Sequence, residues 1–407
     1  MYNRNIKVCH ITFSDHKGGA AIATRRLNEC LKDSKIKSKI YSLDINNNKS
    51  ISLKTNFCNK VFFLFCRILE IFLRKSVYWN SKTIHSFNFF TTNVNKKIKK
   101  FNPDIVHLHY LGSNTISLKD IYLLNKPLVW TFHDMWPILD TEHLNYSGIK
   151  TKNNFIANFI NKKIRNQKKK YFKRKITIVA PSRWMKKEVL KSNFFINQKL
   201  HVVPNPIDIK LWKSINLNNK SFNHFKKKVT IGYCVSGINQ FHKGYDLFKK
   251  ILFNLEKKLK FKIRLICFGD KKFKNLNFYS DKIEVISYPQ LKDEKELIEI
   301  YSSIDLLLVT SRVESFCQVA SEAMSCSVPV VAFKVGGLID LIQNNKTGWL
   351  VEKFSTKKFA AIVNSYINNY SNQIKIKKNC RNYVVMNLNY KNIQKKYEKI
   401  YREVLEK

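Results

Sequence analysis

Two glutamates eight positions apart, Glu314 and Glu322, are the residues of this sequence whose setting best suits chemistry. Glu314 follows a continuous apolar run over Ile304–Val309, which is typical of a strand buried on both faces of a parallel sheet. Glu322 lies in the helical pattern that comes next. The spacing alone favours two solvated glutamates, because charged residues are mostly surface residues. Any function for the pair therefore depends on the elements around it.

The loop between the strand and the helix supplies hydrogen-bond donors. We expect Ser315 to cap the helix and to leave the N–H groups of Phe316, Cys317 and Gln318 as an anion site. A second strand opens at Pro329, and Gly336-Gly337 marks a second tight turn. Both loops fall at the same edge of the predicted sheet, where open α/β sheets bind ligands.

Length and composition limit the possible classes of protein. A chain of 407 residues with 44% apolar residues, 29 Phe and 18 Tyr is too long for one core and has enough apolar material for two folded domains. Its net charge of +45 suggests a nucleic-acid partner or an anionic membrane face. The abundance of Lys, Asn, Ile, Phe and Tyr that an AT-rich genome produces accounts for the charge equally well.

The cysteines and the N-terminus indicate a reduced, cytoplasmic setting. Nine cysteines are scattered without a CxxC pair, so neither a disulfide framework nor structural zinc is expected. The first residues run directly into a predicted strand and show no apolar core of a signal peptide.

The N-terminal half begins with another strand, loop and helix. The strand is expected over Ile6–Phe13 and the helix over Ala20–Leu31, with Gly18-Gly19 in the turn between them. Two glycines before a helix allow the backbone to approach a ligand closely and offer N–H groups to it.

Three histidines lie at the ends of predicted strands. His107 and His109 end one strand, and His133 follows the strand over Pro127–Phe132. We expect no metal here, because HxH on a strand lacks a third ligand nearby. His107 and His109 are interpreted as hydrogen-bonded residues near the edge of the sheet.

Two further segments raise the question of a membrane. Phe57–Trp79 is the most apolar segment, but charged residues interrupt it too often for it to cross a bilayer. A core helix is the favoured interpretation, and an interfacial membrane helix is the alternative. Asn161–Lys175 is a dense basic block with no recognised nucleic-acid motif. We favour anionic lipid or a lipid-linked diphosphate as its partner. The alternatives are the phosphate backbone of a nucleic acid and a helix face that is merely solvated.

Several motifs together resemble one enzyme family. ESF, EAM, SVPVV, GGL and TGWLV follow the order of the donor-binding signature of retaining glycosyltransferases of family 4, which carries a Glu-x7-Glu motif. TFHDMWP looks like the branch of this family that builds bacterial exopolysaccharide, capsule and O-antigen, and PSRW…VVPNPID resembles the segment that closes the family's N-terminal domain. The resemblance extends from the Gly-Gly loop to Trp349. It implies the α/β GT-B fold, with two facing Rossmann-like domains and an interdomain cleft.

The resemblance also implies how the chain divides. Residues 1–208 would form the acceptor-binding domain, on which a C-terminal helix over residues 392–407 would pack. Residues 209–391 would form the nucleotide-sugar-binding domain, and the polar run over residues 213–228 would belong to the connection.

By the same resemblance, individual residues receive roles. Glu322 would bind the ribose hydroxyls and Glu314 a hydroxyl of the donor sugar. Lys243, with the N–H groups of Phe316, Cys317 and Gln318, would hold the diphosphate. Gly18 and Gly19 would reach the acceptor and the diphosphate, and His133 would face the donor sugar at the reacting centre.

The sequence departs from the family pattern at three positions. Ile238 stands where the family has an arginine that clamps the diphosphate, and Cys317 and Ser327 replace glycines. Loss of the guanidinium removes a group that stabilises the departing charge. Either His242 or another basic group would substitute, or the stabilisation is weaker.

These observations predict a retaining hexosyltransferase that moves a sugar from a nucleotide-sugar donor to a glycan, favoured as lipid-linked, in bacterial surface polysaccharide synthesis. No metal or cofactor is expected, since no DxD motif is present, and no specific nucleic-acid partner is expected. The enzyme would work at the inner face of the cytoplasmic membrane. The alternatives are a basic protein that binds nucleic acid or an anionic membrane, and a GT-B scaffold with impaired transfer.

Overall fold

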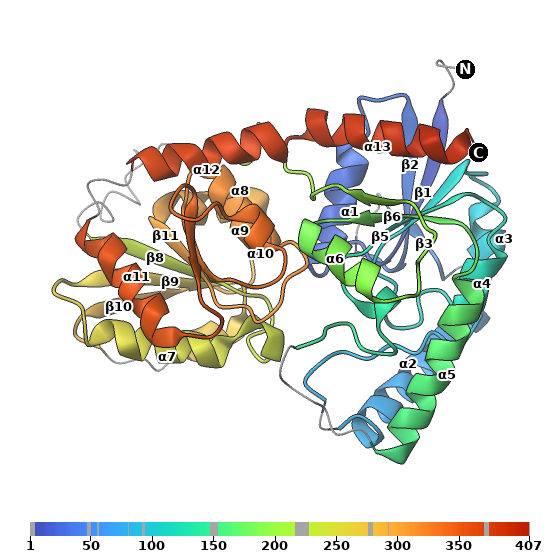
Figure 1. Ribbon diagram of the computed structural model, residues 1–407, viewed down its shortest axis with the longest axis horizontal. Coiled ribbons are helices and arrows are strands. Elements are labelled where there is room, and N and C mark those ends of the chain that lie inside the picture. Colours follow the sequence, from blue (N-terminus) through green and yellow to red (C-terminus); the bar gives the residue numbers. More distant parts are fainter. Residues whose placement is uncertain are drawn as a thin grey trace. The chain divides into compact units, whose positions relative to one another are not determined.

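The computed structural model of the chain (Figure 1) describes residues 5–46, 50–54, 57–79, 81–91, 94–146, 154–215, 228–275, 280–291, 293–369 and 374–406. Most of the predicted connecting segment, residues 216–227, lies outside these ranges. The chain forms two compact units. Unit 1 contains Met1–Pro206 and Tyr390–Lys407, and unit 2 contains Ile207–Asn389.

Unit 1 is built on a seven-stranded parallel sheet with the strand order β3-β2-β1-β4-β5-β6-β7. Its elements are β1 (Ile6–Ser14), α1 (Gly19–Cys30), β2 (Ile36–Asp44), β3 (Ile51–Ser52), α2 (Phe57–Ser76), α3 (Val94–Ile98), β4 (Ile105–Leu108), α4 (Leu118–Leu123), β5 (Leu128–Thr131), η1 (Trp136–Ile138), α5 (Phe155–Tyr171), β6 (Ile176–Ala180), α6 (Arg183–Lys191), β7 (Leu200–Val202) and α13 (Tyr390–Leu405).

Unit 2 is built on a six-stranded parallel sheet with the strand order β10-β9-β8-β11-β12-β13. Its elements are β8 (Thr230–Cys234), η3 (Phe241–Lys243), α7 (Tyr245–Glu256), β9 (Ile263–Phe268), η4 (Lys271–Asn275), β10 (Ile283–Ser287), α8 (Glu294–Ser303), β11 (Leu306–Val309), α9 (Gln318–Ser325), β12 (Val330–Phe333), α10 (Leu338–Leu341), β13 (Gly348–Val351), α11 (Thr356–Asn368) and α12 (Ile374–Asn387). The predicted α/β architecture with two parallel sheets is confirmed.

Local chemistry explains where these elements lie. Apolar runs such as Leu306–Val309 are completely buried, as expected for strands covered on both faces. Several helices begin at a side chain that accepts a hydrogen bond from a backbone N–H in the first turn, which satisfies a donor that the helix leaves open. These capping residues are Ser117, Asn154, Ser182 and Asp293.

The last helix, α13, belongs to unit 1. Ile393, Tyr397, Ile400 and Tyr401 are buried on one of its faces, and α13 contacts α1 and β5. The spacing of these four residues follows the helical period, so one apolar stripe covers the sheet.

The apolar segment over Phe57–Trp79 is not the core helix that we favoured. One face of α2 is buried through Phe63, Cys66 and Glu70, but large apolar side chains on the rest of the helix are exposed. These are Val61, Phe62, Leu64, Phe65, Ile68, Ile71 and Phe72. No helix in the described part of the chain has the length and apolar character needed to cross a membrane.

In each sheet the strand order reverses at one place. The reversal lies between β1 and β4 in unit 1 and between β8 and β11 in unit 2. The loops that leave the two strands on either side of such a reversal diverge and open a crevice at the carboxyl ends of the strands. The loops after β1, β8 and β11 carry most of the candidate site residues.

Candidate active site

In unit 2 the structure brings together two of the predicted site residues. Lys243 ends η3 after β8, and Glu314 lies in the loop after β11, so the two residues come from opposite sides of the strand-order reversal. Lys243 Nζ lies 2.8 Å from Glu314 Oε1, and Ser311 Oγ donates to the same oxygen at 2.8 Å. Their side chains retain 23% and 13% exposure, respectively, so the pair is mostly buried but open to a ligand.

Each member of this pair stabilises the charge of the other. Burial acts to raise the pKa of Glu314, but the Lys243 ammonium and the hydrogen bonds from Lys243 and Ser311 hold that pKa below its usual value. Burial acts to lower the pKa of Lys243, and the charge of Glu314 outweighs it and raises the pKa. Both groups are therefore charged at neutral pH.

The loop that carries Lys243 is fastened to the loop that carries Glu314. Thr310 Oγ1 donates to the carbonyls of Lys243 and Gly244, each at 3.0 Å. Arg312 makes two hydrogen bonds with the Asp246 carboxylate, at 2.8 and 2.6 Å, and donates to the Phe241 carbonyl at 2.8 Å. Two loops from separate strands thus hold one charged pair in place.

A pair of glycines supports the Glu314 loop from the other side. Gly337 N donates to the Glu314 carbonyl at 2.7 Å. A Cβ on Gly336 would lie 2.1 Å from the carbonyl oxygen of Glu314, and one on Gly337 would lie 2.3 Å from that of Ser315. Only glycine permits this close approach, so the Gly-Gly turn positions the backbone on which Glu314 is mounted.

The predicted start of the next helix is wrong by two residues. The N-cap of α9 is Cys317 rather than Ser315, and the helix begins at Gln318. Cys317 has φ 84° and Ser327, after the helix, has φ 64°, so both residues that replace family glycines adopt left-handed backbone. The sequence favoured Ser315 because serine is a more usual N-cap residue than cysteine.

The first turn of α9 presents backbone donors. Cys317 makes no side-chain capping hydrogen bond within the described part of the chain. The N–H groups at the beginning of the helix are therefore suited to an anion. Phe316 and Cys317 are buried and precede the helix, and Gln318 is its first residue.

Glu322 lies one turn further along α9 and is separate from the Lys243–Glu314 pair in its contacts. Its side chain is 5% exposed, and Tyr301 Oη donates to its Oε2 at 3.2 Å. Tyr301 is itself fully buried on α8 and packs against Trp212 and Phe268. The carboxylate is thus oriented by a rigid aromatic neighbour.

Ile238 stands at the position of the missing family arginine, and His242 is the basic residue nearest to it in the sequence. Ile238 is buried, and its N–H donates to Asp270 Oδ2 at 2.7 Å. Burial, with the charge of Lys243, lowers the pKa of His242 to about 4, so His242 is neutral at pH 7. Lys243, by contrast, is charged, because Glu314 raises its pKa.

In unit 1, Gly18 and Gly19 form the beginning of α1. Gly18 is the N-cap and has φ 85° and ψ 165°, a conformation that is almost restricted to glycine. A Cβ at Gly18 would have no heavy atom within 4 Å, so open space borders the backbone there. The N-cap glycine has no side chain with which to cap the helix, so the N–H groups of the first turn are suited to an anion.

His133, which is partly exposed, ends a chain of contacting histidines. Its Nε2 lies 3.1 Å from His109 Nδ1, and His109 Nε2 lies 3.0 Å from His10 Nδ1. Burial lowers the pKa of His133 to about 4 and that of His10 to about 3, so both rings are neutral at pH 7. The rings therefore alternate donor and acceptor nitrogens along the chain.

The strand histidines are hydrogen-bonded near the edge of the sheet, as we predicted. His107 contacts Tyr401 Oη at 2.7 Å and Thr131 Oγ1 at 2.8 Å. The reason given for expecting no metal is wrong, however, because His10 supplies a third nitrogen within 4.8 Å of those of His107 and His109. Both nitrogens of His107 and both of His109 already take part in hydrogen bonds, which a metal ion would have to replace.

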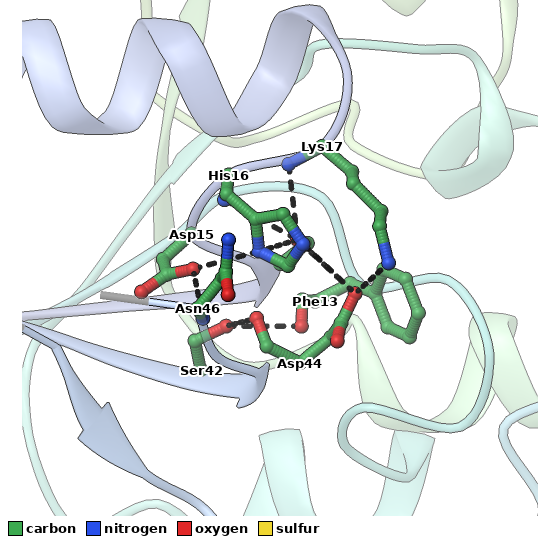
Figure 2. Close-up of polar contacts among 8 residues, drawn as sticks. Phe13, Asp15, His16, Lys17, Ser42, Asp44 and Asn46 are labelled. Carbon is green, nitrogen blue, oxygen red and sulfur yellow. Dashed lines mark hydrogen bonds and ion pairs between the residues drawn. The ribbon is translucent and has the colours of Figure 1, made fainter. Parts of the chain in front are cut away.

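Sequence reasoning missed one polar cluster in unit 1. Asp15 and His16, which follow β1, contact each other and approach Asp44 at the end of β2 (Figure 2). We read SDHKGG only as a turn. The signal available was that a carboxylate and an imidazole directly follow a strand and precede the Gly-Gly turn.

Two family models match the chain. Residues 17–211 match Glycosyltransferase Family 4, and residues 217–383 match Glycosyl transferases group 1. The two matches lie mainly in unit 1 and unit 2, respectively, and together span most of the sequence. The chain belongs to glycosyltransferase family 4. The family predicted from the motifs is confirmed.

Curated relatives of this family 4 chain share shorter stretches with it. The D-inositol 3-phosphate glycosyltransferase of Rhodococcus jostii is 40% identical over 79 residues, which is 19% of this chain and 17% of the relative. The capsular polysaccharide biosynthesis glycosyltransferase CapM of Staphylococcus aureus is 24% identical over 234 residues, which is 56% of this chain and 62% of CapM. The chain thus spans less than two thirds of either relative.

Solved structures match the family 4 chain over nearly its whole length. Sucrose-phosphate synthase from Thermosynechococcus elongatus has a TM-score of 0.71 at 16% identity, covering 98% of this chain and 99% of that one. Anabaena HepE in complex with UDP-glucose has a TM-score of 0.67 at 14% identity, covering 98% and 100%. Such low identities bear on the fold alone, and they confirm the GT-B fold class.

Proposed function

We propose that the family 4 chain is a retaining glycosyltransferase that takes a sugar from a nucleotide-sugar donor and attaches it to a glycan acceptor in the synthesis of a bacterial surface polysaccharide. Family membership supports the reaction class. The relative CapM is named for capsular polysaccharide biosynthesis, and HepE was solved with UDP-glucose. Donor, acceptor and stereochemistry are parts of the proposal.

The observation that carries the proposal is the Lys243–Glu314 pair beside the beginning of α9. A diphosphate placed there would bind the Lys243 ammonium and the N–H groups around Gln318. It would also release Glu314 to accept a hydrogen bond from a hydroxyl of the donor sugar. Breaking the anomeric C–O bond leaves negative charge on the β-phosphate, and donors already in position lower that barrier.

The other predicted site residues fit the same proposal. Glu322 would accept hydrogen bonds from the ribose, and His133 would contact the donor sugar. Gly18 and Gly19 would let the acceptor or the diphosphate approach the backbone. We propose that the reaction needs no resident metal or other cofactor, since the sequence has no DxD motif.

A second candidate is a chain that binds the donor but transfers the sugar poorly. Ile238 takes the place of the arginine, and His242 is neutral at pH 7, so Lys243 would stabilise the leaving diphosphate without a second cation from its own loop. A chain that binds the nucleotide sugar but does not release free nucleotide by transferring the sugar would favour this candidate.

The first experiment is thermal stabilisation by UDP, GDP and ADP, at a salt concentration that suppresses nonspecific binding. One nucleotide should stabilise the wild type and the control Glu296→Ala, which alters an exposed glutamate on α8, but not Glu322→Ala. Stabilisation of none of the three proteins would overturn the proposed donor site. Binding that depends only on salt would favour the nucleic-acid or anionic-surface alternative.

We also propose that unit 1 docks on an anionic membrane. α2 exposes seven large apolar side chains, and α5 adds Phe155, Ile156 and Phe159, with exposures of 86%, 56% and 60%. Tyr78, just after α2, donates to Asn161 Oδ1 on α5 at 2.8 Å, so the two helices lie side by side (Figure 1).

Charge on the same helices selects an anionic lipid surface as the partner. Exposed cations accompany the apolar side chains: Lys60, Arg67, Arg74 and Lys75 on α2, and Lys162, Lys163, Arg165, Lys169 and Lys170 on α5. α5 has no acidic residue, and the one acidic residue of α2, Glu70, is buried. Apolar insertion and attraction to lipid headgroups would act together.

Vesicle sedimentation tests this docking. The wild type should sediment with phosphatidylglycerol-rich vesicles and not with phosphatidylcholine vesicles. Phe65→Ser/Ile68→Ser should lose the binding, whereas Phe261→Ser should keep it, because Phe261 lies in unit 2. Phe261 is a matched control, since all three residues are similarly exposed, at 58–59%. Equal sedimentation of both variants would contradict the assignment of the surface to α2.

A further inference from the structure

Unit 1 contains a polar pocket on the flank of α5. Its volume is about 490 Å³, and sites for small ligands typically measure about 300–1,000 Å³. One wall is the segment after η1, through Asp140 and Glu142. The other wall is α5, which contributes Asn158, Asn161, Lys162, Arg165, Asn166 and Lys169. All of these side chains are polar or charged, so the pocket suits a ligand that forms many hydrogen bonds.

The two walls of the pocket are fastened to each other. Lys168, fully buried on α5, donates to the Asp140 carbonyl at 2.8 Å. Arg165 makes two hydrogen bonds with the Asp140 carboxylate, one of them from Nε to Oδ1 at 2.8 Å. Thr141 Oγ1 donates to Asn161 Oδ1, also at 2.8 Å. The pocket is therefore formed before any ligand binds, as small-molecule sites usually are.

Asn161 offers hydrogen-bond donors to the pocket. It is 6% exposed, and its Oδ1 accepts from both Tyr78 Oη and Thr141 Oγ1, each at 2.8 Å. Since both contacts are made to the oxygen, the Nδ2 group is left over, and within the described part of the chain it has no hydrogen-bond partner. A buried amide without an acceptor is costly unless a ligand or water supplies one.

Glu142 offers acceptors from the opposite wall. Its carboxyl group is partly exposed and accepts from the backbone N–H groups of Thr141, at 3.2 Å, and of Glu142 itself. An ionised carboxylate has room for about four hydrogen bonds, so part of its capacity is left for a ligand.

Donors and acceptors together select the chemical class of ligand. A hydroxyl group both donates and accepts, so neighbouring hydroxyls can bind Glu142 and Asn161 at once. A diphosphate offers almost only acceptors, which would face the carboxylate oxygens of Asp140 and Glu142. An apolar chain would leave all of the lining groups without partners. A saccharide therefore matches the pocket best.

The pocket borders the face of α5 that we assign to the membrane. Asn158, Lys162 and Lys169 are spaced at i, i+4 and i+11, so they share one face of the helix. Phe159 follows Asn158 directly and therefore lies about 100° further around the helix. Phe155 and Phe159 are exposed on that neighbouring face. A glycan with its lipid anchor in the membrane can thus enter the pocket from the side.

We propose that this pocket binds a neutral saccharide unit of the acceptor glycan. The proposal rests on the glycosyl transfer proposed above and deepens it, because it assigns the acceptor a site within unit 1. It also assigns the pocket side of α5 to the hydroxyl groups of the glycan rather than to a lipid-linked diphosphate.

The test measures the binding of simple sugars by saturation-transfer NMR. The probes are glucose, galactose, mannose, rhamnose and N-acetylglucosamine, and inorganic pyrophosphate is followed by its phosphorus line width. Asn166→Trp fills the pocket from an exposed position. Lys170→Trp is the matched control, because Lys170 is exposed on the same helix and does not line the pocket. Thermal unfolding of each variant checks that it is folded.

We expect at least one sugar to bind the wild type and Lys170→Trp with a Kd of about 1–10 mM, as suits a ligand of about 12 non-hydrogen atoms. Asn166→Trp should lose this binding, and Glu142→Gln should weaken it about tenfold, because a hydrogen bond to a charged group is lost. Absence of binding by all five sugars, or equal binding by the wild type and Asn166→Trp, would overturn the proposal. Pyrophosphate binding that Asn166→Trp abolishes, without sugar binding, would assign the pocket to phosphate instead.

Thermal stabilisation by nucleotide separates this proposal from the proposed function. Asn166→Trp should keep the stabilisation of the wild type, because Asn166 lies in unit 1 and the proposed donor site in unit 2. Nucleotide stabilisation without sugar binding would overturn the saccharide pocket alone. Sugar binding that Asn166→Trp abolishes, with no stabilisation by any nucleotide, would overturn the proposed transfer and leave the pocket as a saccharide site.

Discussion

Replacing Lys243 by methionine should destabilise unit 2 by about 3 kcal/mol at pH 7. At the observed 2.8 Å, two unit charges attract each other by about 6 kcal/mol at an effective dielectric constant of about 20. Part of that attraction offsets the cost of removing both groups from water. Removing one partner leaves Glu314 charged, buried and unpaired, which typically costs about 3–5 kcal/mol. The lower end applies because Glu314 keeps 13% exposure and the hydrogen bond from Ser311.

Calorimetry should show the loss as a lower melting temperature of one transition. For a unit of this size, about 3 kcal/mol corresponds to about 6–12 °C. The transition of unit 1 serves as an internal control, because Lys243 lies in unit 2. The double variant Lys243→Met/Glu314→Gln should be more stable than Lys243→Met alone, since no buried charge remains unpaired.

The pH dependence of the variant gives a second check. In the wild type the pKa of Glu314 is lowered, so the stability that the pair contributes is present at neutral pH and is lost as the pH falls through that lowered pKa. In Lys243→Met the charge and the hydrogen bond of Lys243 are lost, so the pKa of Glu314 should rise. The deficit relative to the wild type should therefore shrink between pH 7 and pH 4.5. A deficit below about 1 kcal/mol at pH 7, or one that does not change with pH, would refute this reasoning.

Two further predictions concern backbone groups. Cys317→Gly should change the stability of unit 2 by no more than about 1 kcal/mol. Cys317→Val should lower it by more than about 2 kcal/mol, because a β-branched residue resists the φ of 84°. Equal effects of the two variants in calorimetry would show that the backbone there relaxes. Lys168 is fully buried and donates to the carbonyls of Trp136, Leu139 and Asp140. Lys168→Met should lower the melting temperature of unit 1 and leave that of unit 2 unchanged, since buried carbonyls without donors each cost about 1–3 kcal/mol. An unchanged melting temperature of unit 1 would indicate that water replaces the ammonium.

Local patterns predicted most of the fold and the candidate site residues of unit 2. Buried strands appear as apolar runs, tight turns as glycine pairs, and strands alternate with helices, so both parallel sheets follow from the sequence. The resemblance carried by Glu-x7-Glu and Lys243 predicted a donor site, and the structure places Lys243 beside Glu314 at the carboxyl edge of the sheet.

The sequence by itself could not determine contacts between residues far apart in the chain. His10 and His109 are 99 positions apart, and only the pairing of β1 with β4 brings their rings together. The exposure of α2 was also beyond prediction, because periodicity shows that a helix has an apolar face but not whether a neighbour covers it.

The Asp15–His16 pair shows this division most clearly. The two residues are adjacent in the sequence, which shows a carboxylate next to an imidazole, but the strength of their interaction depends on burial. Asp15 is buried and His16 partly exposed only because β2 ends beside β1 and brings Asn46 and Asp44 to the loop. Sequence determines which groups are available; the tertiary structure decides which of them lose water and therefore act on one another.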